Sequence, residues 1–110
     1  MSLDISLIIP AKDEAESLPE LHQWISRVLT AHGFSYEIIF IDDGSSDRTW
    51  AVMRELAGLD GRVKAIRFNR NYGKSAALST GFREAQGHVV ITMDADLQDS
   101  PDEIPALYKM

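Results

Sequence analysis

The sequence predicts an α/β fold built on a Rossmann-like, mostly parallel sheet, and three observations lead to that prediction. Short runs rich in β-branched residues alternate with longer segments whose apolar residues recur at helical spacing, as in βαβ units. The run Ile38–Ile41 is continuously apolar, which suits a sheet covered by helices on both faces. The chain has 110 residues, 45% of them hydrophobic, so we expect one folded domain and no disordered segment.

The N-terminal third is expected to hold a strand and a helix. Ile5–Ile9 is the predicted strand, and Pro10 is expected to end it. Ser17 is expected to be the N-cap of the helix, with Glu20 in position for a capping box and Gly33 as the C-terminal stop. The residues at helical spacing between these ends are Leu18, Leu21, Trp24, Ile25, Val28 and Leu29.

The middle of the chain predicts a second strand, a second helix and a third strand. Glu37–Ile41 is the second strand. Ser46 or Asp47 is expected to begin the helix, which ends at Gly58. The residues that this helix is expected to bury are Trp50, Met53 and Leu56. Val63–Phe68 follows as the third strand.

The last third predicts a polar loop, a third helix, a fourth strand and the start of another helix. The loop Asn69–Gly73 leads into a helix that Gly87 closes, and Val89–Met93 is the fourth strand. The third helix is expected to run through Ala76, Ala77 and Phe82. The signals for a further helix are Ser100, Pro101 and Glu103. Because that helix has barely begun at Met110, the sequence favours a longer parent domain.

Composition excludes several classes of function. The 11 Lys and Arg residues against 17 Asp and Glu give a net charge of −6, which opposes binding to a nucleic acid and suits a protein that holds a cation through carboxylates. No cysteine is present, so a disulfide framework, a thiol nucleophile and a thiolate metal site are excluded. No apolar run reaches the length of a membrane span and no basic leader begins the chain, so a cytoplasmic location is expected.

A polar cluster follows each of the four predicted strands. The clusters are Lys12-Asp13-Glu14, Asp42-Asp43-Gly44-Ser45, Asn69-Arg70-Asn71 and Asp94-Ala95-Asp96. In a parallel sheet all four lie at the carboxyl edge, where open α/β sheets bind ligands. The sequence therefore predicts a ligand site along that edge.

The last of these clusters has two interpretations. In an extended chain the carboxylates of Asp94 and Asp96 project to the same side, and a cation between them relieves their repulsion. Oxygen ligands without His or Cys select Mg²⁺ or Mn²⁺, and Gln98 would add a neutral oxygen. The alternative is a solvated turn in which an Asp caps a helix.

The cluster after the second strand suits a tight turn into a helix, since Gly44 tolerates unusual backbone angles and an Asp favours a helix N-terminus. That account explains one Asp, and the other can accept hydrogen bonds from a ribose or a base. Lys74 is not part of a P-loop, because Phe68 stands where that loop requires glycine. Lys74 either meets a phosphate or is a solvated residue at the start of a helix.

Four segments, taken in order, resemble the family 2 glycosyltransferases of GT-A fold, most of all those that move a sugar from a nucleotide onto a polyprenyl phosphate. The segments are Ile8–Glu14, Ile41–Asp47, Asn69–Lys74 and Met93–Asp99, so the resemblance covers nearly the whole chain. The sequence departs from the family at Lys12 and Asp13, where an aromatic residue and Asn are usual. The resemblance implies inverting transfer from a UDP- or GDP-sugar to a polyprenyl phosphate, with a divalent metal.

The resemblance also implies which residues contact the nucleoside. Pro10, Ala11 and Glu14 would line the pocket for the base and the ribose. Ile41 would contact the base through its backbone, and Asp43 would recognise the base.

The remaining implied roles concern the diphosphate and the metal. Asp94 and Ala95 would reach the ribose and the diphosphate. Asp96 would hold the Mg²⁺ or Mn²⁺ ion, with Asp94 as a further ligand and Gln98 assisting. The single domain of family enzymes is about twice this length, and its second half supplies the acceptor site and the catalytic base. No catalytic residue is therefore expected before Met110, and the chain is expected to be the nucleotide-binding half of a GT-A domain.

Two other functions stay open from the sequence. A phospho-accepting receiver domain shares the doubly wound pattern and the paired acids, although here the acid pair follows the second strand. The second is a fragment whose exposed edge strand associates with a second copy.

A lipid-phosphate acceptor would bring the parent protein to the cytoplasmic face of a membrane.

Overall fold

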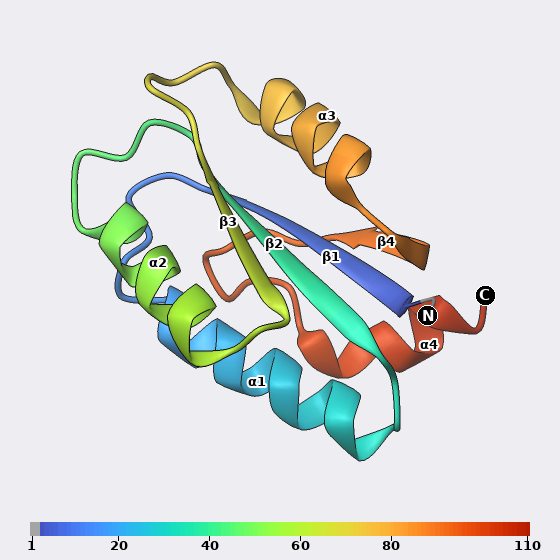
Figure 1. The fold of residues 1–110 in the computed structure, drawn as a ribbon. Coiled ribbons are helices and arrows are strands. Elements are labelled where there is room, and N and C mark those ends of the chain that lie inside the picture. The colour runs from blue at the N-terminus through green and yellow to red at the C-terminus, as the bar shows by residue number, and fades with distance from the viewer. Residues whose placement is uncertain (1–2) are drawn as a thin grey trace.

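Four parallel strands form the central sheet of the computed structural model, which describes residues 3–110 (Figure 1). The strands are β1 (Leu3–Ala11), β2 (Tyr36–Asp42), β3 (Val63–Arg67) and β4 (Gly87–Thr92). Their order across the sheet is β3-β2-β1-β4, and each neighbouring pair runs parallel. The predicted parallel α/β fold is confirmed.

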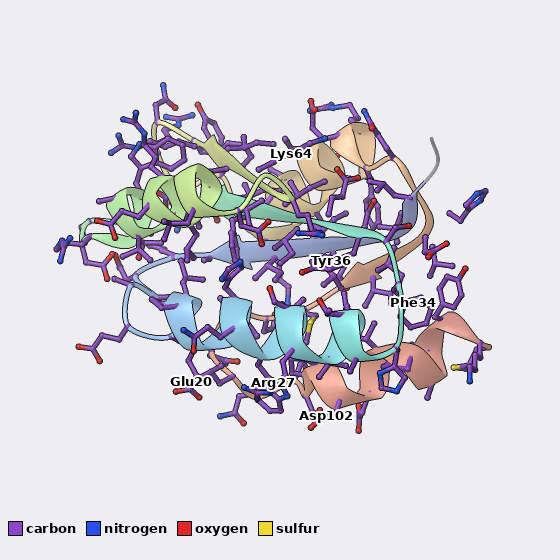
Figure 2. All side chains as sticks on the ribbon, turned by 60° about the horizontal axis from the view of Figure 1, so that its bottom comes forward. Glu20, Arg27, Phe34, Tyr36, Lys64 and Asp102 are labelled. Atoms are coloured by element: carbon purple, nitrogen blue, oxygen red, sulfur yellow. The ribbon has the colours of Figure 1, made fainter. Side chains whose placement is uncertain are left out.

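Helices cover both faces of this sheet (Figure 1). They are α1 (Leu18–Ala31), α2 (Thr49–Leu59), α3 (Lys74–Glu84), the short 3₁₀ helix η1 (Pro101–Glu103) and α4 (Ile104–Tyr108). α1, α2 and α4 lie on one face and α3 lies on the other. Trp24 of α1 donates to Asp102 of η1, and the ring of Phe34 meets Tyr108 of α4 edge-on. Figure 2 labels Asp102 and Phe34. None of the helices within residues 3–110 has the length and apolar character of a membrane span.

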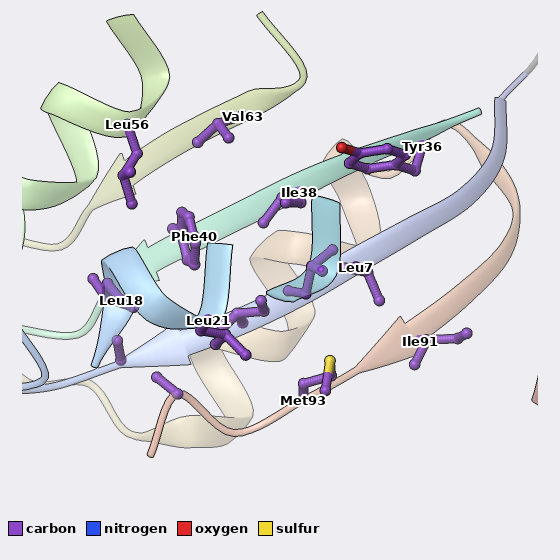
Figure 3. Close-up of a cluster of buried hydrophobic side chains, with 14 of the residues drawn as sticks. Leu7, Leu18, Leu21, Tyr36, Ile38, Phe40, Leu56, Val63, Ile91 and Met93 are labelled. Atoms are coloured by element: carbon purple, nitrogen blue, oxygen red, sulfur yellow. The ribbon is translucent and has the colours of Figure 1, made fainter. Parts of the chain in front are cut away.

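The larger apolar core lies between the sheet and helices α1, α2 and α4. Figure 3 shows its part beside α1 and α2. Its strand residues include Leu7, Ile38, Phe40 and Val63, and its helix residues include Leu18, Leu21 and Leu56. A smaller core on the other face consists of Ile8, Ile39, Ile41 and Ala77. α3 lies very close to β1 there, and a Cβ added at Gly81 would collide with the Ile8 side chain.

The first strand is longer than predicted, because Pro10 does not end it. Pro10 pairs with Ile41 of β2 inside β1. Along its other edge, β1 pairs with β4 only as far as Ile8 and Thr92, so the missing N–H of Pro10 costs no ladder bond. Gly87 begins β4 and does not close α3, which ends at Glu84.

The ends of α1 agree with the prediction in position but not in chemistry. Ser17 is the N-cap, and Gly33, with a φ of 74°, follows the last turn. The Ser17 hydroxyl makes no capping bond, because it donates to the carbonyl oxygen of Ala95 at 2.6 Å. The predicted capping box with Glu20 is therefore wrong, and Ser17 instead binds the start of α1 to the loop after β4.

Two other helices differ from the prediction. α2 begins later, at Thr49, because the Asp47 carboxylate accepts hydrogen bonds from the backbone N–H and the hydroxyl of Thr49. In α3, Ala77 and Gly81 face the sheet. Phe82 consequently points outward and is 53% exposed.

The strand order reverses direction at β1. From β1 the chain moves outward through β2 to β3, and it then crosses to β4 on the other side of β1. Open α/β sheets bind ligands at the carboxyl ends of the strands beside such a switch point, here β1 and β4. A receiver domain has the order 2-1-3-4-5, in which β1 lies between β2 and β3. The observed order excludes that alternative.

Candidate functional site

The four polar loops form one rim at the carboxyl end of the sheet. Asp43, after β2, accepts a hydrogen bond from the backbone N–H of Gly73 in the loop before α3. The next residue, Lys74, reaches Asp94 after β4. The loop after β1 is bound to the loop after β2 through Asp13. The predicted gathering of polar clusters along one edge is confirmed.

Two adjoining hollows open at the switch point between β1 and β4. One has a volume of about 140 Å³ and is lined by Pro10, Ala11, Lys12, Lys74 and Asp94. The other has a volume of about 100 Å³ and is lined by Lys74, Leu78, Thr92, Met93, Asp94 and Asp99. A ligand in either hollow therefore meets Lys74 and Asp94.

Lys74 and Asp94 form an ion pair at this place. The Nζ atom of Lys74 lies 2.7 Å from Oδ1 of Asp94, and the side chains are 62% and 48% exposed. The hydrogen bond to Asp94 and the charge of Asp94 raise the pKa of Lys74, and the charges of Asp99 and Asp96 add to that rise. Asp94 contacts the ammonium group, and Asp99 and Asp96 act on it through their charge, so this part of the rim keeps an excess of negative charge.

Asp99 is a residue that the sequence reasoning missed. Its Oδ2 accepts a hydrogen bond from the backbone N–H of Asp94 at 3.0 Å, which brings its carboxylate to the same hollow as Lys74. The signal in the sequence was the series of acids Asp94, Asp96 and Asp99 after a single strand.

The segment Asp94–Asp96 is a turn and is not extended as predicted. Ala95 and Asp96 lie in the turn, Leu97 has a φ of 67°, and Asp96 Oδ1 accepts from the backbone N–H of Gln98 at 3.1 Å. The hydrogen bond from Ser17 to the carbonyl of buried Ala95 holds this turn against α1. The prediction that both carboxylates project from one face of an extended strand is therefore wrong.

The chemistry of this turn nevertheless fits a hard divalent cation. Among residues 3–110, no group of three or more His, Cys, Asp or Glu side chains is arranged to hold a metal. Mg²⁺ commonly binds one or two protein carboxylates and completes its shell with water and substrate phosphates. Asp94 and Asp96 suit that kind of incomplete site. The ammonium group of Lys74 already stands there as a cation.

The two acids at the end of β2, Asp42 and Asp43, are both buried, and both bind backbone groups. Oδ1 of Asp42 accepts from the backbone N–H of Ser45 at 2.9 Å and shapes the turn toward α2. Asp43 is 7% exposed and accepts from the backbone N–H groups of Tyr72 and Gly73 at 2.8 and 3.1 Å. The turn explanation therefore applies to Asp42, while Asp43 holds the loop that leads into α3.

The residues implied to bind a nucleotide lie in different parts of the rim. Those that line the switch-point hollows are Pro10, Ala11, Lys74 and Asp94. Glu14 lines a separate hollow of about 330 Å³ beside Asp47. The Ile41 side chain is buried in the core below α3, so only its backbone is available for a contact.

Asp13 binds the loop after β1 to the loop before α2. Its φ of 55° is left-handed, a conformation that Asp and Asn adopt more easily than other side chains. Its Oδ1 accepts from the backbone N–H groups of Ser46 and Asp47 at 2.8 and 3.3 Å. Its own N–H donates to Ser45 Oγ at 2.8 Å.

The substitution Asp13→Ala is expected to lower the free energy of unfolding by about 1–2 kcal/mol, because it removes the acceptor and leaves alanine in a left-handed backbone. Asp13→Asn keeps a carbonyl oxygen at the same place, so its loss should be less than half as large. Urea denaturation of the two variants measures both values. Equal losses in the two variants would contradict the role given to the Oδ1 atom.

Comparisons with known sequences point to one family. A family model described as glycosyl transferase family 2 matches residues 6–110. A curated protein of Pseudomonas fluorescens, named undecaprenyl-phosphate 4-deoxy-4-formamido-L-arabinose transferase, is 46% identical over 104 residues, which are 94% of this chain and 30% of that protein. A protein of the same name from Edwardsiella ictaluri is also 46% identical, over 94% of this chain and 32% of its own length.

Solved structures share the fold. Mannosyltransferase PcManGT from Pyrobaculum calidifontis, solved in complex with GDP-Man and Mn²⁺, has a TM-score of 0.80 and 24% identity, covering 98% of this chain and 32% of that one. Glucosyl-3-phosphoglycerate synthase from Mycobacterium tuberculosis, solved with UDP, has a TM-score of 0.71 and 25% identity over 94% of this chain and 38% of that one. The chain spans about a third of the length of the curated relatives it matches.

Proposed function

The chain belongs to glycosyl transferase family 2, and from that premise we propose that it forms the donor-binding part of an enzyme that transfers a sugar from UDP or GDP to a polyprenyl phosphate. The observation that supports this most is the pair Lys74–Asp94, which borders two hollows at the switch point of a parallel sheet. The names of the curated relatives support the acceptor. The complex of PcManGT with GDP-Man and Mn²⁺ supports a nucleotide-linked donor and a divalent metal.

The residues at the switch point are proposed to bind the donor through its diphosphate. Pro10 and Ala11 form one wall of the hollow, and Lys74 donates to a phosphate oxygen. Asp94 and Asp96 are the proposed ligands of Mg²⁺ or Mn²⁺, with Asp99 beside them. The ion, when bound, supplies positive charge that stabilises the leaving nucleoside diphosphate.

The nucleoside is proposed to lie on the β2 side of the diphosphate. Glu14 and the backbone of Ile41 remain the proposed contacts of ribose and base. Asp43 is the proposed reader of the base. Its Oδ1 accepts from both Tyr72 and Gly73, while its Oδ2 accepts from Gly73 and keeps a second lone pair for the base.

The acceptor, the stereochemistry and the location are proposals of the same kind. A phosphate oxygen of the acceptor attacks the sugar from the face opposite the diphosphate, which inverts the configuration at the anomeric carbon. The catalytic base lies in the part of the relatives that this chain does not span. Because the acceptor is a lipid, the reaction takes place at the cytoplasmic face of a membrane. Within residues 3–110 β4 pairs with β1 alone, so its outer edge is the proposed contact with a second copy.

Calorimetric titration of the chain with UDP and with GDP, with and without Mn²⁺, tests the proposed function. We expect Mn²⁺ to tighten the binding of at least one nucleotide by about tenfold or more. In Asp96→Ala the tightening by Mn²⁺ should disappear, because that variant loses a ligand of the ion.

A matched control is Glu84→Ala, which removes one exposed acid at the far end of α3. This variant should keep the full effect of Mn²⁺. Nucleotide binding that Mn²⁺ leaves unchanged in the unsubstituted chain would contradict the proposal. The same holds for an Mn²⁺ effect that survives in Asp96→Ala.

A further inference from the structure

We propose that Lys74 takes the place of the divalent cation on Asp94 before the donor binds, and that its ammonium group moves to the donor's diphosphate when cation and donor bind together. The inference rests on the proposed function. It adds a coupling between the two ligands of that site, carried by one side chain.

Lys74 and a divalent cation compete for Asp94. Nζ of Lys74 lies 2.7 Å from Oδ1 of Asp94. A Mg²⁺ ion needs a carboxylate oxygen at about 2.0–2.1 Å, and two positive groups on one oxygen repel each other strongly at such distances. Oδ1 of Asp94 can therefore hold the ammonium group or the ion at close range, but not both, and an ion on Oδ2 would still lie beside the ammonium charge. Lys74 would therefore weaken the binding of a cation that arrives without the donor.

The ammonium group of Lys74 can move from Asp94 into the hollows beside it. Lys74 is 62% exposed, so its side chain is free to swing about a fixed backbone. It borders the hollow of Pro10, Ala11 and Lys12 as well as the hollow of Asp99. The ammonium group of Lys74 could reach the oxygens of a diphosphate bound in these hollows by a rotation of its side chain alone. The displaced ammonium group then exchanges one anionic partner for another.

The rim holds the backbone of Lys74 in place. Lys74 is the first residue of α3, and the N–H of Gly73 before it donates to Asp43. Gly73 has a φ of 97°, which orients the chain into the helix. Since the backbone is held on both sides, the exchange needs a side-chain movement only, and no rearrangement of the fold.

The exchange predicts that cation and nucleotide bind cooperatively. When the cation binds alone, Lys74 loses the Asp94 carboxylate and has only water as its partner. When the nucleotide binds alone, Lys74 is still paired with Asp94. When both bind, Lys74 keeps a partner throughout. Thermodynamic linkage requires the two ligands to tighten each other's binding by the same factor.

The test measures Mn²⁺ affinity by electron paramagnetic resonance of free Mn²⁺, with and without UDP or GDP, in Lys74→Met and Lys74→Arg. We expect Lys74→Met to bind Mn²⁺ alone about three- to tenfold more tightly, because nothing competes for Asp94. The factor by which nucleotide tightens Mn²⁺ binding should fall, and the part that remains comes from phosphate oxygens that bind the ion directly. Lys74→Arg keeps a cation on Asp94, so it should retain most of the coupling.

Lys12→Met is the matched control for net charge, because Lys12 lines the same hollow and makes no ion pair with Asp94. It should change the affinity for Mn²⁺ alone by less than Lys74→Met does. Equal tightening in the two variants, or none in Lys74→Met, would overturn the exchange.

The outcomes separate the exchange from the proposed function. If the unsubstituted chain binds Mn²⁺ and nucleotide together but Lys74→Met retains the full coupling, the exchange is wrong and the proposed function stands. If the unsubstituted chain binds neither nucleotide in the presence of Mn²⁺, the proposed function is wrong and the exchange falls with it.

Discussion

Alanine in place of Gly44 is expected to lower the free energy of unfolding by about 3 kcal/mol. Gly44 has a φ of 79°, and an added Cβ would lie 2.5 Å from the backbone nitrogen of Asn71 and 2.6 Å from the carbonyl carbon of Arg70. A left-handed alanine costs about 1–2 kcal/mol by itself. The contact would also push the loop before α3 away from Asp43, and its hydrogen bonds would weaken.

Gly33→Ala is the control for the left-handed backbone alone. Gly33 has a φ of 74°, and a Cβ there would meet no atom within 4 Å. Its expected loss is about 1 kcal/mol, because only the backbone conformation is disfavoured. Urea denaturation followed by circular dichroism measures both variants. A loss at Gly44 no greater than that at Gly33 would show that the close approach of the two loops does not matter.

Alanine in place of Glu37 is expected to cost about 3 kcal/mol, because it would remove the centre of a buried polar network. Glu37 is 2% exposed. Its Oε2 accepts from Ser6 Oγ at 2.6 Å and from the backbone N–H of Gln86 at 2.7 Å, while Lys64 Nζ lies 2.9 Å from Oε1. Ser6 Oγ accepts in turn from the N–H of Gly87. The network joins β1, β2 and β3 to the start of β4.

Glu37→Gln separates the hydrogen bonds from the charge. It keeps one oxygen for Ser6 and Gln86, so its loss should be about half that of the alanine variant. Denaturation at neutral pH measures both. A Glu37→Ala variant as stable as the unsubstituted chain would mean that water replaces the network without cost.

The same network makes stability depend on pH. Burial raises the pKa of Glu37, but hydrogen bonds from Ser6, Lys64 and the Gln86 N–H outweigh it and hold that pKa below the ordinary value of 4.5. The unfolded chain therefore binds a proton at higher pH than the folded chain does. The stability that Glu37 contributes is fully present above about pH 4.5, the ordinary pKa of the group. It is lost as the pH falls through the lower pKa that Glu37 has in the folded chain. The gap in stability between the unsubstituted chain and Glu37→Gln should narrow from pH 7 to pH 3.

Much of the fold is predictable because it depends on local pattern. β-branched runs and helical periodicity identify the four strands and the first three helices, and parallel pairing follows from their alternation. The errors arise from contacts between distant residues. Pro10 stays in β1 because β4 no longer pairs with β1 at that point. The hydroxyl of Ser17 donates to the carbonyl oxygen of Ala95, 78 residues away, and does not cap α1.

The candidate site is predictable in place but not in shape. Parallel strands bring the acids after β2 and β4 to one rim, as the sequence indicates. Neither the turn at Asp94–Asp96 nor the burial of Asp43 under the loop before α3 follows from spacing. Both depend on hydrogen bonds to the rest of the rim. The ion pair of Lys74 with Asp94 likewise requires the crossover that brings α3 beside β4.

Paramagnetic broadening of backbone amide signals by Mn²⁺, in the presence of UDP or GDP, tests most directly whether the acids of this rim hold a cation. We expect broadening centred on Ala95, Asp96 and Gln98 and reaching Lys74, while amides at the opposite end of the sheet, such as Gly33, stay sharp. Broadening centred on the hollow of Glu14 and Asp47 would contradict it, because the ion would then lie away from the switch point.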